Sequence, residues 1–153
     1  MTGESSARMP GIYVHLSYDR PADAVEWLCR VFDLREIRLE HSDAAEPHML
    51  AGPCGGMVMI WGLTEDFKGW MRSRAPRFHE PGERPWPYLS HSVSVHVLNV
   101  DEHHKRSQRE SAMVLSLPTD QPWGVRSYSA LDTEGHQWEF VQMLDAAAAG
   151  AVG

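Results

Sequence analysis

"DQPWGVRSYSALDTEGHQWEF", residues 120–140, is the stretch that decides the fold. A proline-tryptophan-glycine turn is followed by an extended run, an acidic turn that ends at Gly135, and an alternating run. In the alternating run Trp138 and Phe140 share one face of a strand, because successive side chains point to opposite faces. The opposite face then carries Gln137, Glu139 and Val141. The stretch therefore predicts two strands joined by a turn, with Trp138 in the core and one carboxylate on the other face.

The region before this stretch repeats a pattern found near the start of the chain. "GIYVHLSYDRPADAVEWLCRVF" (11–32) and "HSVSVHVLNVDEHHKRSQRESA" (91–112) each open with period-two alternation, which indicates a strand. Helix signals follow, because Pro21 suits a first helical turn and Asn99 or Asp101 can cap a polar helix. Three extended pieces follow each helix: "REIRLEH", "HMLAG" and "MVMIW" in the first copy, and "AMVLSL", "RSYSALD" and "QWEFVQM" in the second.

The repeated βαβββ pattern is an internal duplication. Each helix covers one face of its half-sheet, so the other face is free to curl. We therefore predict an α+β fold in which duplicated βαβββ modules form a curled mixed sheet around a cleft. The modules are assigned to residues 11–61 and 91–143, with a proline-rich linker or lid at 62–90 that is long for a compact domain. Residues 1–10 are expected to be a flexible N-terminus, and residues 144–153 a disordered tail.

Composition limits the possible partners of the chain. With 153 residues, of which 42% are hydrophobic, the chain can build one globular domain, and no apolar run approaches the length of a membrane span. Cys29 and Cys54 form no disulfide framework, and "MTGESSARMP" lacks the apolar region of a secretory signal, so a cytoplasmic protein is expected. The formal charge of -7 disfavours nucleic acid and anionic membranes as partners.

The strand faces assigned to the cleft supply the candidate ligand-binding residues. Indoles offer large flat faces for stacking, and methionines such as Met57 and Met59 form an adaptable wall for a bulky ligand. Each of these residues can instead pack in the core or in an oligomer interface. The candidate set is Tyr13, His15, Met59, Trp61, Trp86, Ser92, Ser94, His96, Trp123 and Glu139.

Other polar residues are expected to have structural roles and not to bind a ligand. Arg126 follows the proline-tryptophan-glycine turn and is expected to pair with Asp132 or Glu134 and fix the loop. His103 and His104 lie on a polar segment that we expect to be exposed. Adjacent histidines on a helix point in different directions, so chelation by this pair is not expected.

The duplicated pattern, "PADAVEWLCRVFDL" and "GVRSYSALDTEGHQWEF" together resemble the vicinal oxygen chelate superfamily, across roughly residues 11–143. This superfamily includes glyoxalase I, extradiol dioxygenases, fosfomycin-resistance enzymes and bleomycin-resistance proteins. The stretch 120–140 is particularly similar to the bleomycin-resistance branch, in which a proline-tryptophan-glycine turn, an arginine and an acidic turn with glycine occur in that order.

The resemblance implies four metal-ligand positions, at Tyr13, Met59, Ser92 and Glu139. Only Glu139 is a good ligand for zinc or nickel, because neutral tyrosine, methionine and serine bind such ions poorly. No metal and no other cofactor is therefore expected. An improvised site of His15, His96 and Glu139 is the alternative, although the two histidines are displaced along their strands by roughly 7 and 13 Å from the implied positions.

Three functions remain open at this point. The first is a homodimeric, bleomycin-resistance-type protein that sequesters a bulky aromatic small molecule in a metal-free cleft, as in antibiotic resistance. The alternative is a divalent-metal-dependent lyase or dioxygenase that resembles glyoxalase I, with Glu139 as ligand and His15 or His96 as ligand or general base. The third is a structural or regulatory dimer with a vestigial cleft. In the first case Glu139 is expected to be hydrogen-bonded to Tyr13, Ser92 or His15.

Overall fold

The computed structural model of the chain describes residues 11–37, 47–63 and 91–144, and it confirms the α+β class and the duplicated arrangement. The other residues, which include Trp86 and most of the predicted linker, lie outside this description. The first module comprises β1 (Val14–Tyr18), α1 (Pro21–Phe32), β2 (Arg35–Ile37), β3 (His48–Ala51) and β4 (Met57–Gly62). The second comprises β5 (Val93–His96), α3 (Val100–Arg109), β6 (Met113–Val114), β7 (Thr119–Gln121), β8 (Val125–Leu131) and β9 (Gln137–Met143).

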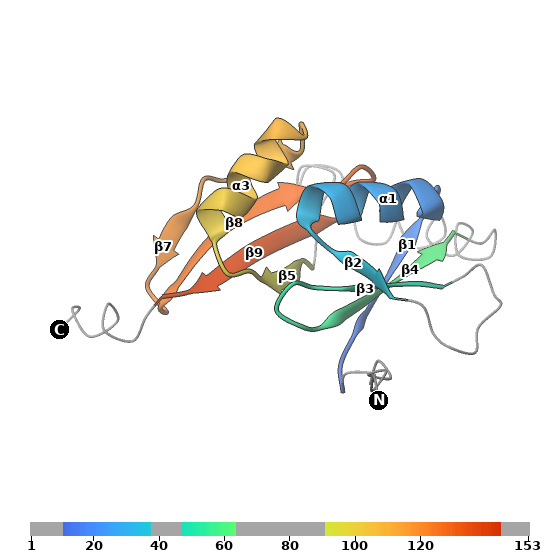
Figure 1. Ribbon diagram of the computed structural model, residues 1–153, viewed down its shortest axis with the longest axis horizontal. Coiled ribbons are helices and arrows are strands. Elements are labelled where there is room, and N and C mark those ends of the chain that lie inside the picture. Colours follow the sequence, from blue (N-terminus) through green and yellow to red (C-terminus); the bar gives the residue numbers. More distant parts are fainter. Residues whose placement is uncertain (1–10, 38–46, 64–90, 145–153) are drawn as a thin grey trace, which may run out of the picture.

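Each module forms a mixed sheet, with the strand order β1-β4-β3-β2 in the first and β5-β9-β8-β6 in the second. The pairs β1–β4 and β5–β9 are parallel, and the other pairs are antiparallel. Both helices lie on the same side of the two sheets (Figure 1). In the described part of the chain β1 and β5 each have one partner strand, so each is an edge strand.

The second module has one strand more than the sequence predicted. The sequence predicts no strand at residues 119–121, but these residues form β7, which pairs with β8. The register places Gln121 opposite Val125, and Gly124 takes a positive φ of 84° in the tight turn between them. The proline-tryptophan-glycine turn is therefore the tip of a hairpin.

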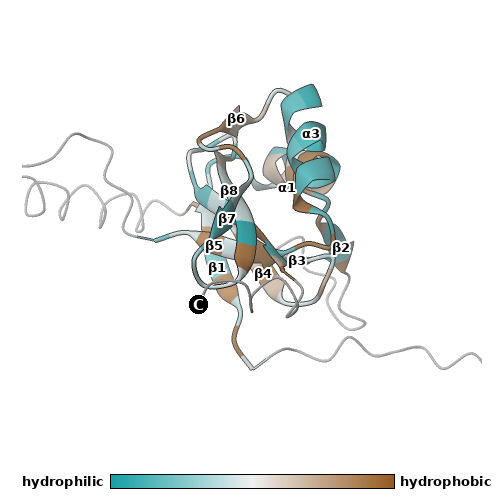
Figure 2. Cartoon of the chain, turned by 90° about the vertical axis from the view of Figure 1, so that its left-hand side faces the viewer, coloured by the Kyte–Doolittle hydropathy of each residue, from teal (hydrophilic) through white to brown (hydrophobic). Residues whose placement is uncertain are grey.

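The helix α3 is polar but packs closely (Figure 2). Asn99 caps its first turn by accepting the Glu102 N–H at 3.0 Å, as predicted. The prediction that His103 and His104 are exposed is wrong, because both are buried. His103 tolerates burial since its Nδ1 bonds the Tyr128 hydroxyl at 2.7 Å and its Nε2 bonds the Phe32 carbonyl at 3.0 Å.

One hydrophobic core joins the two modules. It combines the inward faces of both helices with the helix-side faces of both sheets. Trp138, Phe140 and Phe32 lie at its centre, and each is fully buried. The predicted core position of Trp138 is thus confirmed, and the two sheets direct equivalent faces into the same core.

A buried carboxylate also connects the modules. The Tyr18 hydroxyl on β1 donates to Asp132 at 2.6 Å, and the Trp138 indole N–H donates to the same oxygen at 2.9 Å. In the same turn Glu134 accepts the backbone N–H groups of Asp19 and Arg20, at 2.6 and 3.1 Å. The β8–β9 turn of the second module is therefore fastened to the start of the first.

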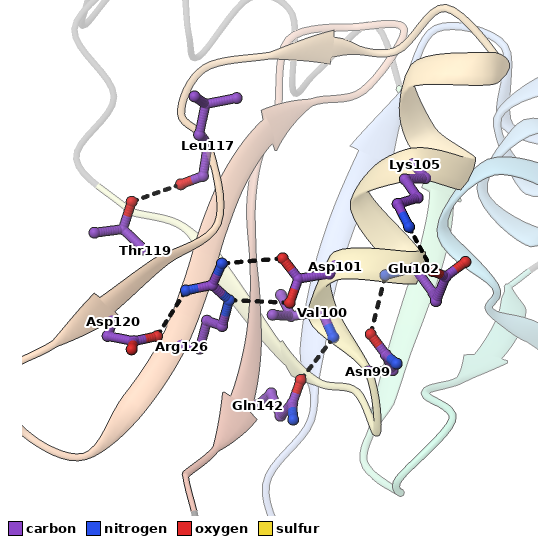
Figure 3. Close-up of polar contacts among 10 residues, drawn as sticks. All are labelled: Asn99, Val100, Asp101, Glu102, Lys105, Leu117, Thr119, Asp120, Arg126 and Gln142. Atoms are coloured by element: carbon purple, nitrogen blue, oxygen red, sulfur yellow. Dashed lines mark hydrogen bonds and ion pairs between the residues drawn. The ribbon is translucent and has the colours of Figure 1, made fainter.

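The expected pairing of Arg126 with Asp132 or Glu134 is wrong. The Arg126 guanidinium makes two bonds of 3.0 Å to Asp101 on α3 and one of 2.7 Å to Asp120 on β7 (Figure 3). Arg126 has the same strand parity as Tyr128, so it points to the helix side of the sheet, where α3 begins. None of the helices in the described residues is long and apolar enough to cross a membrane.

Candidate functional site

Each sheet has a face that points away from the shared core, and the predicted site residues lie mainly on these two faces. The first face belongs to the first sheet and carries Tyr13, His15, Ser17, Met49, Met57, Met59 and Trp61. The second face belongs to the second sheet and carries Ser94, His96, Ser127, Ser129, Gln137, Glu139 and Val141. The alternation of the sequence predicts these faces for β1, β4, β5 and β9.

Three side chains on the first face form what we call the aromatic cluster: Tyr13, His15 and Trp61. The rings of Tyr13 and His15 are 5.3 Å apart and tilted by 38°. The Trp61 indole N–H donates to His15 Nδ1 at 2.9 Å, and these two rings are 12° from parallel. Tyr13 and His15 are exposed and Trp61 is half-buried, so the cluster is open to a ligand.

A methionine layer lies beside the aromatic cluster. Met49, Met57 and Met59 are buried and pack with one another, and Ile37 and Trp61 pack against them. This group is separate from the shared core, because the core takes the alternate residues Val58 and Ile60 of the same strand. The first face therefore has a buried, apolar and adaptable layer next to flat rings.

Glu139 is half-buried on the second face and accepts a hydrogen bond from the Ser94 hydroxyl at 3.1 Å. Its expected partners, Tyr13, Ser92 or His15, are not the ones it has. The parallel β5–β9 register places Ser94 directly opposite Glu139, which explains the contact. The prediction that Glu139 lies on the face opposite the helices is correct, since Trp138 and Phe140 are buried in the core.

The four positions implied for a metal do not form a fitting donor set. Met59 is buried in the methionine layer, Tyr13 belongs to the aromatic cluster, and Ser92 is exposed at the start of β5. Among the described residues there is no group of three histidine, cysteine or acidic side chains placed to hold a metal ion. In the alternative site, His15 Nδ1 is already occupied by the Trp61 N–H. Glu139 is the one strong ligand type at the four implied positions.

The predicted residues do not form a single cluster within one chain. In the described part, no hydrogen bond, ion pair or ring contact joins the aromatic cluster to Ser94, His96 or Glu139. Trp123 lies at the tip of the β7–β8 hairpin, where it is 68% exposed and belongs to neither face. Trp86 lies outside the described residues.

Tyr18 and Tyr128 are buried polar residues that the sequence patterns did not single out, and Tyr18 joins the two modules through its bond to Asp132. Burial raises the pKa of Tyr18, and the neighbouring Asp132 raises it further. For Asp132 burial favours protonation, but hydrogen bonds from His136, Tyr18 and Trp138 outweigh burial and hold its pKa below the usual value. Burial raises the pKa of Tyr128 to about 12. The parity of Tyr18 with Leu16 is the sequence signal that predicts its burial.

No protein-family model and no curated protein sequence matches the chain. Among solved structures, TioX from Micromonospora sp. ML1 is 30% identical with a TM-score of 0.61, and the match covers 90% of this chain and 98% of TioX. A glyoxalase/bleomycin resistance protein/dioxygenase family enzyme from Burkholderia phytofirmans PsJN is 14% identical, with a TM-score of 0.59 and coverage of 86% and 97%. The fosfomycin resistance protein FosX from Listeria monocytogenes, in a complex with Mn(II), is 14% identical, with a TM-score of 0.56 and coverage of 87% and 90%. The last two likenesses establish the fold alone.

Proposed function

Because the chain belongs to the vicinal oxygen chelate superfamily of glyoxalases, bleomycin-resistance proteins and dioxygenases, we propose that it binds and sequesters a bulky aromatic small molecule. The proposal describes a cytoplasmic binding protein of the bleomycin-resistance type, with a role in antibiotic resistance. The observation that carries it is the aromatic cluster of Tyr13, His15 and Trp61 beside the methionine layer. Flat rings supported by an adaptable apolar layer are typical of sites for planar ligands.

The proposed site uses no metal and no catalytic residue. Its support is the donor set, in which Glu139 is the one strong ligand among the four implied positions. A half-buried carboxylate with one hydrogen bond in the described residues instead favours a ligand that carries positive charge. The Ser94 hydroxyl donates to one oxygen of Glu139, and in the described part of the chain no hydrogen bond occupies the second oxygen, which we assign to such a ligand.

We further propose that the protein is a homodimer in which each cleft combines the first face of one copy with the second face of the other. Within one chain the two faces carry separate candidate groups, while their opposite sides share one core. The edge strands β1 and β5 each have an unpaired edge in the described part, which favours association. Apolar residues at the start of β1 support this, since Ile12 is 88% exposed and Tyr13 and Val14 are each 37% exposed.

Titration of tryptophan fluorescence tests the binding function. Bleomycin and other planar antibiotics are expected to quench the emission with a Kd below about 100 μM, which corresponds to roughly 5.5 kcal/mol. The Trp61→Phe variant is expected to lose most of the quenching, whereas Trp123→Phe is expected to keep it, because Trp123 lies on neither face. If the folded protein binds none of these compounds, the proposal is wrong.

Metal analysis separates this proposal from the alternative, a metal-dependent lyase or dioxygenase. The protein is purified without added ions and its zinc, nickel, iron and manganese contents are measured. A sequestering protein is expected to contain less than stoichiometric metal. Stoichiometric metal in the wild-type protein that is lost in Glu139→Gln would replace the proposal with the enzyme.

A further inference from the structure

The geometry of the aromatic cluster restricts the ligands that it can bind. The Trp61 indole N–H donates to His15 Nδ1 at 2.9 Å, and the two rings are 12° from parallel, with centroids 5.9 Å apart. An indole N–H lies in the plane of its ring, so a well-aligned acceptor lies close to that plane. The two rings are therefore side by side in nearly one plane. Together they form a flat surface that is longer than either ring.

The strand register holds these rings side by side. In the parallel β1–β4 pair, His15 lies opposite Met59 and Ser17 lies opposite Trp61. Trp61 is thus the diagonal neighbour of His15 on the same face, within reach of a long aromatic side chain. Met59 is buried directly opposite His15, and Trp61 packs against the methionine layer to which Met59 belongs. The flat surface follows from the pairing of the two strands.

The same hydrogen bond depends on the protonation state of His15. An indole nitrogen can only donate, so His15 Nδ1 is an unprotonated acceptor and the neutral ring carries its proton on Nε2. An imidazolium has no acceptor and cannot form this bond. In the described residues, the other titratable or charged side chains on this face of the sheet are Tyr13, directly before β1, and Arg35 at the far edge, on β2. Neither accepts the Trp61 N–H in place of His15.

We propose that the ligand of the first face is a planar molecule of at least two fused rings, which stacks across Trp61 and His15 together and is released when His15 is protonated. This inference rests on the proposed binding function and specifies its ligand class and its pH response. A single six-membered ring can cover one of the two rings, whereas a fused system contacts both across the 5.9 Å between their centroids. Protonation removes the bond that aligns the two rings, so the longer surface is lost.

Two neutral probes test the inference on the full-length protein. 2-Naphthalenemethanol and benzyl alcohol carry the same substituent, differ by one fused ring, and do not ionise between pH 5 and 8. Their binding is followed through the ¹H–¹⁵N signal of the Trp61 indole, which is assigned with the Trp61→Phe variant. At pH 8 the naphthyl probe is expected to bind about three- to tenfold more tightly through the added stacking. At pH 5 this advantage is expected to disappear.

Two variants of His15 separate stacking from general hydrophobicity and from acid unfolding. His15→Gln keeps an acceptor for the Trp61 N–H but has no ring, so its naphthyl preference is the baseline due to hydrophobicity at either pH. His15→Phe keeps a ring that cannot be protonated, so it is expected to bind the naphthyl probe equally at pH 5 and pH 8.

The possible results distinguish this inference from the function on which it rests. If the wild-type preference equals that of His15→Gln, or does not change between pH 8 and pH 5, the fused-ring inference is wrong while binding at Trp61 still supports the proposed function. If neither probe shifts the Trp61 signal of the folded protein at pH 8, both proposals are contradicted.

Discussion

The polar side chains of Glu139 and His103 differ in how many of their hydrogen-bonding atoms have a partner in the described residues. His103 has a partner within the chain for each ring nitrogen, whereas the described residues give Glu139 one hydrogen bond, from the Ser94 hydroxyl. A carboxylate that lacks full hydrogen bonding on a half-buried face loses hydration without full compensation. We therefore expect Glu139 to bind a ligand and His103 to contribute to the stability of the fold.

Replacing Glu139 by Gln is expected to weaken binding of a cationic planar ligand by about 1–3 kcal/mol, because a charged hydrogen bond is lost while the shape is kept. Isothermal titration calorimetry at pH 7.5 measures the change. Glu102→Gln is the matched control, since Glu102 is exposed on α3 and pairs with Lys105 away from both faces. Equal affinity of the Glu139→Gln variant and the wild type would remove Glu139 from the site.

The burial of His103 predicts that the folded protein loses stability in acid. Burial is the main cause that lowers its pKa below the ordinary value of 6.5. The unfolded chain therefore takes up a proton near pH 6.5, while the folded protein does so only at lower pH. The contribution of the neutral His103 ring to the free energy of unfolding is fully present above pH 6.5. It falls as the pH decreases toward the folded-state pKa, by at most about 1.4 kcal/mol per pH unit.

Urea unfolding between pH 8 and pH 5 tests this prediction. The wild-type protein is expected to lose more stability over this range than His103→Gln, which cannot take up the proton. A His91→Gln variant controls for histidines in general, because His91 is exposed before β5. An identical pH dependence in wild type and His103→Gln would show that His103 does not contribute.

At the scale of elements, the β8–β9 turn acts as a connector between modules. Asp132 accepts side-chain hydrogen bonds from Tyr18 and Trp138, and backbone N–H groups from Glu134 and His136 at 3.0 Å. The carboxylate is fully paired, so removal of one donor leaves a buried charge less compensated.

Tyr18→Phe is therefore expected to destabilise the protein by about 1.5–3 kcal/mol, the range for a buried hydrogen bond to a charged group. Urea unfolding at pH 7.5 measures the loss. Tyr13→Phe removes the same hydroxyl group from an exposed position and is expected to change stability little. If both variants unfold at the same urea concentration, the bond between Tyr18 and Asp132 does not stabilise the junction.

The elements also show what sequence patterns can and cannot predict. Alternation predicted the faces of β1, β4, β5 and β9, because a buried face demands regular apolar spacing. It missed β7, since a strand of three residues that pairs through its backbone needs no apolar pattern. It also missed the burial of His103 and the partners of Arg126, because both depend on groups that are distant in sequence. The hydrogen bond between Ser94 and Glu139 could not be predicted, because it depends on the strand register, which alternation alone does not specify.

At the scale of the whole molecule, the proposed homodimer predicts the mass of the protein in solution. Sedimentation velocity is expected to give twice the chain mass of 17.3 kDa. Ile12→Lys introduces a charge beside the edge strand β1 at a position that is 88% exposed, so it is expected to favour the monomer without unfolding the chain. Leu117→Lys changes another exposed apolar residue, which is 68% exposed and lies before β7, and is expected to leave the dimer intact. A wild-type monomer at all concentrations would contradict the shared cleft.

The contact between Tyr18 and Asp132 spans 114 positions of the chain, and this has a consequence for protein synthesis. A ribosome that adds about 5–20 residues per second needs roughly 6–23 s to travel from one residue to the other. Throughout that interval the nascent first half has an apolar surface and no complete second half to cover it. Aggregation competes with completion during this time, so the yield in a cell depends on the supply of chaperones that hold nascent chains as well as on the stability of the finished protein.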